Sequence, residues 1–536
     1  MASTAAGRSS VSAARTSEVE RIIATADVAA DYPGKAVKYR GRRSTWPGAL
    51  GLLLFFAGSI AGLTYFGIQK RNQVRYGTAS DAAILDMYGS GTRIPDGRMP
   101  QPDPDVVVLN PAEYQDLTCE QPNYITKKNR IVAQFKSGRE VIMNIKGVNW
   151  LGMQDNKYVP KGLWDGKKDG NTLTRYAIFL SENGFNAVRL ALSVDAALRN
   201  VVPDETLINT KSNRALKTSR YIPLLSSIIQ GLGVYHIAVV LNFQVLSALV
   251  KESGLWEGSS IKLADTQKAI SNLANELCNS KHYNIIGIDL KDNVAMATWG
   301  DKSESDWAQA ATTLGNHVIR ECPRWLVFVQ GIEGPSRRNS FVAEDGSEKI
   351  VRLKYFTGSD LSGVATAPIV LKKKGKLVYS PKYFTSSYQL LDFFFSGGTP
   401  KGGLLMDYVE STNATLKKNV DLSMEYMFGS ALASDSAVVL SSFGGLVGSL
   451  DRTELKTSTR IIEILISKMQ NRTGGLAGGF WWQLNPDAVY PYRAPDLANG
   501  TKAGLLLESW KVANMPVLRE LEKMAAVPNV NFVPCV

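Results

Sequence analysis

The chain has 536 residues, which exceeds a compact domain of usual size and leaves room for one large barrel with additional segments. Its hydrophobic content of 44% is typical of a globular protein, and its formal net charge is +12. The longest cationic cluster, the lysines around Gly375, has no interleaved aromatic residues, so nucleic-acid binding is not expected.

The amino-terminal part predicts a tail followed by a membrane helix. Residues 1–46 are rich in Ala, Ser, Thr and Arg without apolar periodicity, which predicts a disordered cytoplasmic tail. Pro47–Ile68 holds 22 residues without a charge, about 33 Å as a helix, which is enough to cross a bilayer. A signal peptide would be shorter and nearer the amino terminus, and a buried core helix would show polar positions at helical spacing. We therefore predict a single transmembrane helix.

The flanks of this segment predict its orientation. Five cations lie between residues 35 and 43, against three between residues 70 and 75, which favours a cytoplasmic amino terminus. All cysteines follow the segment, as do three N-x-[ST] glycosylation sequons at Asn413, Asn471 and Asn499. An even cysteine set and sequons are typical of an oxidising compartment. The expectation is a single-pass type II membrane protein whose main domain is extracellular or luminal.

Beyond the span, we expect a stem over residues 69–125 and a barrel domain over residues 126–536. Four prolines between Pro95 and Pro104 favour an extended spacer. From about Ile131, short apolar strands alternate with helical patterns, which predicts an α/β fold, a (β/α)₈ TIM barrel. A doubly wound open sheet is the alternative, but no Gly-rich phosphate loop follows the first strand. The eight expected strands are Ile142–Trp150, Asn186–Ser193, His236–Gln244, Ile285–Asp292, Leu326–Ile332, Lys376–Tyr383, Ala437–Gly444 and Gly479–Asn485.

The barrel also predicts how the four cysteines pair. Cys278 and Cys322 each end a helix that precedes a strand, the fourth and the fifth, so both lie at the same rim. Cys119 and Cys535 flank the whole barrel, where a disulfide would join its two ends. Closing so long a loop would stabilise the fold by roughly 4–5 kcal/mol in the chain-entropy model. The expected pairs are Cys278–Cys322 and Cys119–Cys535.

Seven motifs follow one another along the expected strands. They are FKSGREVIMNIKGVNW (Phe135–Trp150), GFNAVRLALS (Gly184–Ser193), IIGIDLKDN (Ile285–Asn293), Leu326–Gly331, KLVYSPKY (Lys376–Tyr383), VVLSSFG (Val438–Gly444) and FWWQLNPD (Phe480–Asp487). In this order they resemble glycoside hydrolase family 5, the cellulase and glucanase family, and the membrane-anchored arrangement is similar to that of family members from oomycetes. The resemblance covers about Ile131 to Val517 and implies the same barrel, with the substrate at the carboxyl ends of the strands.

The resemblance implies two catalytic carboxyl groups, and neither is present. A retaining glycosidase uses an acid/base and a nucleophile about 5 Å apart. The family's Asn-Glu-Pro triplet is replaced by Asp292-Asn293-Val294, so Asn293 stands at the acid/base position. Its Glu-Phe-Gly sequence is replaced by Ser442-Phe443-Gly444, so Ser442 stands at the nucleophile position. An amide has no titratable proton near neutral pH, and a serine without an adjacent base is a poor nucleophile.

Other ionisable residues of the family's site are replaced as well. Its Asp-x-His motif becomes Asn242-Phe243-Gln244, its strand-six histidine becomes Lys382, and a strand-five glutamate becomes Gln330. Arg189, Trp482 and the Asn149-Trp150 pair are retained. The expected substrate-binding residues are Asn149, Trp150, Arg189, Asn242, Gln244, Asp292, Lys382 and Trp482.

Two alternatives remain open for a catalytic carboxylate at a different position in the chain. Asp292 neighbours the acid position, although strand alternation predicts that its side chain points to the other face. Asp407 and Glu410 lie between strands six and seven and could reach over the cleft, or be ordinary surface carboxylates. The three histidines show no metal-ligand spacing, so neither a metal nor another cofactor is expected.

Three functions follow from this reading. The leading hypothesis is a membrane-tethered pseudo-glycosidase that binds a β-glucan or another carbohydrate without cleaving it, because aromatic faces bind sugar rings without ionisable partners. The second is an active endoglucanase-like hydrolase that uses relocated carboxylates. The third is a protein-interaction or adhesion scaffold with an obsolete cleft.

Overall fold

The computed structural model describes residues 109–536, apart from 167, 402–403, 472–473 and 491–500, together with eight residues between 50 and 64. The chain divides into two compact units, Met1–Ala79 and Ser80–Val536. The predicted tail, most of the predicted span Pro47–Ile68 and most of the predicted stem lie outside the described residues. Within the described part, no helix combines the length and the apolar character needed to cross a bilayer.

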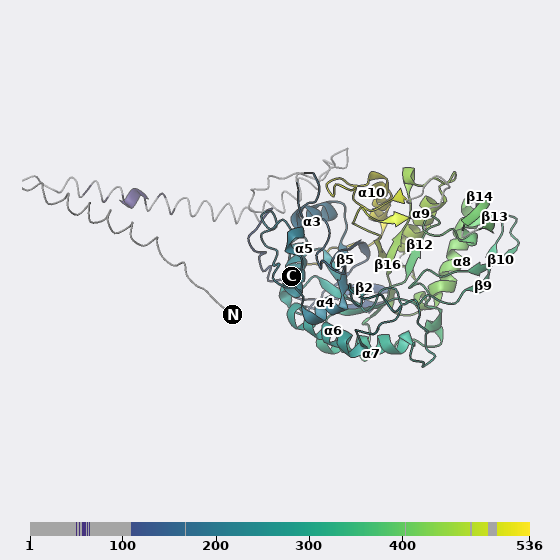
Figure 1. The fold of residues 1–536 in the computed structure, drawn as a ribbon, viewed down its shortest axis with the longest axis horizontal. Helices are drawn as coiled ribbons and strands as arrows, with labels where there is room; N and C mark the ends of the chain where they lie inside the picture. Colours follow the sequence, from purple (N-terminus) through teal and green to yellow (C-terminus); the bar gives the residue numbers. More distant parts are fainter. Residues whose placement is uncertain are drawn as a thin grey trace, which may run out of the picture. The chain divides into compact units, whose positions relative to one another are not determined.

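The second unit contains a closed parallel barrel, as the sequence predicts (Figure 1). The sixth and the seventh strand of the barrel are each divided into two short strands. The sixth consists of β11 and β12, and the seventh of β15 and β16. Because β11 pairs with β15 and β12 pairs with β16, the broken strands still close the ring between β8 and β17. The barrel strands are β4 Ile145–Trp150, β5 Ala187–Ser193, β6 Ala238–Val245, β7 Ile285–Asp289, β8 Leu326–Val329, β11 Leu377–Tyr379, β12 Lys382–Phe384, β15 Ala437–Val438, β16 Leu440–Gly444 and β17 Gly478–Trp481.

All eight expected strands are therefore confirmed, and several start or end a few residues away from the expected bounds. The difference matters most for β7, which ends at Asp289 rather than at Asp292. Every residue of β4, β5 and β7 is buried, as expected for strands that are covered on both faces.

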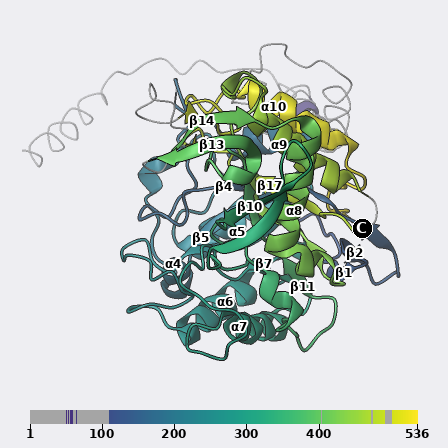
Figure 2. The same cartoon turned by 90° about the vertical axis from the view of Figure 1, so that its right-hand side faces the viewer.

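Helices surround the barrel and occupy the intervals between its strands (Figure 2). Their starts are capped where the sequence provides an oxygen: Thr172 accepts from the backbone of Arg175, and Asp306 accepts from that of Gln309. The α-helices are α3 Leu173–Glu182, α4 Val194–Arg199, α5 Tyr221–Val234, α6 Leu263–Leu277, α7 Trp307–Glu321, α8 Asn413–Leu432, α9 Thr457–Gln470 and α10 Met515–Glu522. The 3₁₀ helices are η1 Glu205–Leu207, η2 Ser280–His282, η3 Ser362–Ala365, η4 Asp392–Phe394, η5 Gly448–Leu450 and η6 Lys523–Ala526.

A three-stranded antiparallel sheet packs against the amino-terminal end of the barrel. It consists of β1 Asn123–Lys127, β2 Arg130–Gln134 and β3 Glu140–Ile142. Tyr124 and Ile131 from this sheet join the apolar cluster that fills the barrel interior, which includes Val240 and Phe328. The barrel is thus a packed core whose amino-terminal end is covered by this sheet.

Three further hairpins lie outside the barrel. The first two, near α8 in both views, are β9 Arg337–Val342 with β10 Glu348–Leu353 and β13 Phe395–Lys401 with β14 Leu404–Glu410 (Figures 1 and 2). The third joins β18 Val489–Tyr490 to β19 Thr501–Lys502. The β9–β10 hairpin follows β8 in place of a helix, so this strand–helix unit departs from the regular pattern.

Both predicted disulfides, Cys278–Cys322 and Cys119–Cys535, are confirmed. Their Cα atoms are 5.9 and 4.8 Å apart, respectively. Cys278 and Cys322 directly follow α6 and α7, so the neighbouring helices bring them together at one rim of the barrel. Of the three sequon asparagines, Asn413 and Asn471 are exposed, whereas Asn499 lies outside the described residues.

Candidate functional site

The predicted site residues lie at the carboxyl ends of the barrel strands. Strand register places Asn149 beside Arg189 and Lys382 beside Ser442. Hydrogen bonds then connect side chains from β4, β5, β6 and β12 with those that follow β7 and β8. The structure therefore brings most of the predicted residues into one cluster.

Arg189 is at the centre of this cluster and is 1% exposed. Its Nη1 donates to Asn149 Oδ1 at 2.9 Å, and its Nη2 donates to Asn242 Oδ1 at 2.7 Å. The same Nη2 lies 2.9 Å from one carboxylate oxygen each of Asp289 and Asp292. Arg189 thus fixes four neighbouring side chains, and its charge is balanced by two buried carboxylates.

Asp292 is fully buried, and both of its oxygens are occupied. Oδ1 accepts from Arg189 and, at 2.5 Å, from Gln330 Nε2. Oδ2 accepts from Lys382 Nζ at 2.8 Å and from Gln244 Nε2 at 2.7 Å. Burial alone would raise the pKa of Asp292, but the adjacent Lys382 and Arg189 cations and the Gln330 amide hold that pKa well below its usual range. This carboxyl group is therefore ionised at neutral pH and unsuited to donate a proton.

The prediction that Asp292 points to the opposite face of its strand is wrong. Side chains alternate only while the chain remains extended, and β7 ends three residues earlier. The chain then turns, and Asn293 adopts a left-handed conformation with φ of 56°. This turn places Asp292 in the charge cluster and leaves Asn293 exposed.

Asp289 is the second buried carboxylate, and its environment differs from that of Asp292. Burial raises its pKa to about 6, while Arg189 partly opposes and Asp292 reinforces this shift. Its Oδ1 and the nearby Gln330 Oε1 are buried, and neither has a hydrogen-bond partner among the described residues. A proton on Asp289 Oδ1 would give Gln330 Oε1 the donor that it lacks, which agrees with the raised pKa of Asp289.

Lys382 connects this cluster to Asn293 and Ser442, the two residues that the sequence comparison predicts at the family's carboxylate positions. Besides its ion pair with Asp292, its Nζ donates to Asn293 Oδ1 at 2.5 Å. Its strand neighbour Ser442 is fully buried, with Oγ 3.4 Å from Asn149 Nδ2. A lysine ammonium thus lies in direct contact with the residue at position 293.

The two predicted tryptophans lie in different environments. Trp482 is partly exposed after β17, as a ring that binds sugar must be. Trp150 is 1% exposed: its Nε1 donates to Lys161 O at 2.9 Å, and its ring packs edge-on against Tyr176. The expectation that Trp150 binds substrate is therefore wrong, because its indole belongs to the core around the barrel.

Two residues near the site were missed by sequence reasoning. Tyr388 is 44% exposed and stacks on Phe384 at 4.5 Å, and burial, Glu333 and Asp292 together raise its pKa. Glu333 is exposed, and its backbone N–H donates to Val294 O, next to Asn293. Glu333 lies in the loop after β8, and Tyr388 lies in the loop after β12. The sequence could have indicated them only through the general rule that functional residues lie in the loops after barrel strands.

The distant carboxylates do not form a catalytic pair. Glu410 accepts from the backbone of Leu455 at 2.9 Å and from the Thr457 hydroxyl at the start of α9, so it joins β14 to this helix. Asp407 is exposed on the β14 side of its hairpin. Among the described residues, no group of His, Cys, Asp and Glu is arranged to hold a metal ion.

No family model matches the chain, but individual proteins do. An endoglucanase from Paenibacillus polymyxa is 25% identical over 403 residues, which cover 75% of this chain and 86% of that protein. The major extracellular endoglucanase of Xanthomonas campestris pv. campestris is 24% identical over 389 residues, which cover 71% of this chain and 68% of that protein. The chain is a distant relative of bacterial endoglucanases.

Solved structures support the fold. An endocellulase from Pyrococcus horikoshii in complex with cellotetraose aligns with a TM-score of 0.59 at 23% identity, covering 76% of this chain and 99% of that one. The catalytic domain of the Xanthomonas endoglucanase aligns with a TM-score of 0.57 at 22% identity, covering 75% and 99%. The similarity in fold therefore extends over the barrel.

We expect Asp292→Ala to destabilise the fold strongly, because it leaves Lys382 and Arg189 buried with one carboxylate fewer. Removing one partner of a buried ion pair typically costs about 3–5 kcal/mol. The matched control is Asp435→Ala, whose carboxylate is exposed and should change the free energy of unfolding by no more than about 0.5 kcal/mol. Urea denaturation measures both values, and equal effects would contradict a central role of Asp292.

A second prediction concerns the pH dependence of stability. Because the pKa of Asp289 is raised in the folded state, its contribution to stability is fully present below pH 4 and is lost as the pH rises through about 6. The shift from the usual value of 3.8 corresponds to roughly 3 kcal/mol. The wild type should therefore lose stability relative to Asp289→Asn between pH 4 and 7. Parallel stability curves for the two proteins would refute the shift.

Proposed function

We propose that this protein is a pseudo-glycosidase that binds a β-glucan in its barrel cleft and does not hydrolyse it. The carrying observation is the contact between Lys382 and Asn293: the acid/base position holds an amide that is hydrogen-bonded to a buried ammonium group. A glycosidase needs a proton donor here, and neither partner is a carboxylic acid. At the nucleophile position, Ser442 contacts an asparagine amide, not a base.

The nearest carboxylates do not restore the chemistry in this proposal. Asp292 is ionised and saturated with donors, and Asp289 lies beneath it with no exposed surface. Glu333 is accessible, but its Oε2 accepts from the Thr357 hydroxyl at 2.8 Å, and a retaining mechanism needs a second carboxyl group about 5 Å away. Asn293 and Ser442 occupy both positions from which that second group would come.

Carbohydrate binding remains supported because its groups are present. Trp482 and Tyr388 offer partly exposed rings, and the amides of Gln244 and Asn293 offer polar groups near them. Ring faces pack on the apolar faces of pyranose rings without requiring ionisable partners. The related Pyrococcus structure contains cellotetraose, which suggests a β-1,4-glucan as the first ligand to test.

We further propose that the barrel is displayed outside the cytoplasm on a type II membrane anchor. The uncharged run Pro47–Ile68 would be the anchor. The two disulfides and the exposed Asn413 and Asn471 sequons fit an oxidising, glycosylating compartment. The relative from Xanthomonas is named as extracellular.

Titration of cello-oligosaccharides into the full-length protein tests the binding proposal. We expect saturable binding without release of reducing sugar. Trp482→Ala and Tyr388→Ala should each raise the Kd roughly two- to tenfold, as loss of a ring contact does. Val370→Ala, which removes an exposed apolar side chain before β11, should leave the Kd unchanged.

The failing outcomes separate the alternatives. A folded wild type that binds no β-glucan would overturn the proposal and favour a protein-interaction scaffold. Release of reducing sugar that Glu333→Gln abolishes would instead establish a relocated hydrolase.

A further inference from the structure

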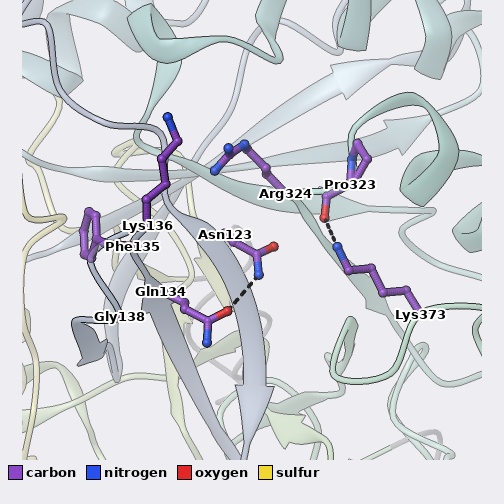
Figure 3. Close-up of a pocket in the computed structure, with 8 residues that line it drawn as sticks. All are labelled: Asn123, Gln134, Phe135, Lys136, Gly138, Pro323, Arg324 and Lys373. Carbon is purple, nitrogen blue, oxygen red and sulfur yellow. Dashed lines mark hydrogen bonds between the residues drawn. The ribbon is translucent and has the colours of Figure 1, made fainter.

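A concave site lies at the opposite end of the barrel from the cluster around Arg189. It is a hollow of about 390 Å³ between the β1–β2 hairpin, the start of β8 and the loop before β11. Three cationic residues, Lys136, Arg324 and Lys373, line it, and no carboxylate does (Figure 3). Lys373 belongs to the lysine cluster around Gly375.

The three cations have no counter-ion within the described part of the chain. No carboxylate oxygen there lies within 4.0 Å of the charged nitrogens of Lys136, Arg324 or Lys373. Like charges that converge without a partner repel one another, and the repulsion is relieved when an anion binds between them. Among the described residues, these three side chains therefore form a positively charged cluster without a neutralising carboxylate.

The hollow is held in shape by its own contacts. Arg324 Nη1 donates to Gln121 O at 2.5 Å, and Arg324 O accepts from the backbone N–H of Tyr124 at 3.0 Å. Lys373 Nζ donates to Pro323 O at 3.3 Å, as Figure 3 shows. Two of the cations are thus positioned by backbone groups, whereas the Lys136 side chain extends freely on the far side.

A buried lysine beneath the hollow reports the same positive field. Lys376 is fully buried, and its Nζ donates to Asn123 Oδ1 at 2.9 Å and to the backbone oxygen of Tyr124. Burial, together with the neighbouring Lys373 and Arg324 cations, lowers the pKa of Lys376 to about 7. Lys373 and Arg324 are therefore close enough to Lys376 to act on it together, and Lys136 lines the same hollow.

From this geometry we propose that the hollow binds a multivalent oxyanion of the sulfate or phosphate type. The chemistry matches because Arg324 offers a fixed guanidinium fork and the two lysines supply charge around it. An adjoining hollow shares Lys136 and Arg324 but is also lined by Glu120, so the anion is assigned to the carboxylate-free side. The anion could be free in solution or carried on a lipid head group, and both sources present the same group.

Calorimetric titration of the full-length protein with sodium sulfate tests the site, because sulfate keeps a fixed charge at neutral pH. We expect saturable binding that weakens with added sodium chloride. Lys136→Ala combined with Arg324→Ala should weaken it at least tenfold. Lys372→Ala combined with Lys374→Ala is the matched control: it removes two exposed lysines next to the hollow and should weaken binding less than threefold.

Two additional measurements make the result decisive. The single variant Lys136→Ala removes a side chain that makes no hydrogen bond or ion pair with the described residues. It should weaken sulfate binding by itself, so the test does not depend on whether Arg324→Ala perturbs the fold. Phosphatidylcholine vesicles with and without a phosphatidylinositol phosphate identify the source: capture that depends on this lipid and on Arg324 assigns the lipid head group. Two outcomes would overturn the proposal. One is no saturable sulfate binding together with the same capture by vesicles with and without the phosphatidylinositol phosphate. The other is that the two double variants weaken binding equally.

Discussion

The ion pair between Lys382 and Asp292 is the interaction on which the candidate site depends. It joins the carboxyl ends of strands six and four, and through Asp292 it reaches Arg189, Gln244 and Gln330. Two buried cations face two buried carboxylates, so the cluster is neutral when Asp289 is ionised. Desolvation of each ion is costly, and only the complete set of partners offsets that cost. The cluster is therefore cooperative: the loss of one partner disturbs the others.

In the function that we propose, the same ion pair makes the candidate site unsuited to glycoside hydrolysis. In a retaining enzyme of this type, a carboxylic acid must hold its proton until the leaving oxygen needs it. Here Lys382 contacts position 293 directly, and an ammonium group beside a carboxyl group would favour its ionised form. The lysine is thus incompatible with an acid at that position, and the amide of Asn293 accepts its hydrogen bond instead. The substitutions at positions 293 and 382 support each other.

Sequence reasoning predicted the barrel and both disulfides because these follow from periodicity and from strand order. Buried parallel strands leave continuous apolar runs, and helices that precede adjacent strands bring Cys278 and Cys322 to the same rim. Reasoning about individual side chains succeeded only where regular structure continued. Asp292 was placed on the wrong face because the strand ends at Asp289, and Trp150 was assigned to the cleft although Tyr176 and Lys161 enclose it. Tyr388, Glu333 and the hollow around Arg324 arise from loop conformations, which have no periodic signature.

A reducing-sugar assay on three proteins tests the central claim most directly: the wild type, Asn293→Glu with Ser442→Glu, and the same double change with Lys382→His. The two introduced carboxyl groups should lie about 5 Å apart. We predict no turnover by the wild type and weak turnover by the double variant, whose acid would be ionised by Lys382. The triple variant should be faster, because that ammonium group is gone. A wild-type rate equal to or above that of either variant would contradict the claim that positions 293, 382 and 442 abolish hydrolysis.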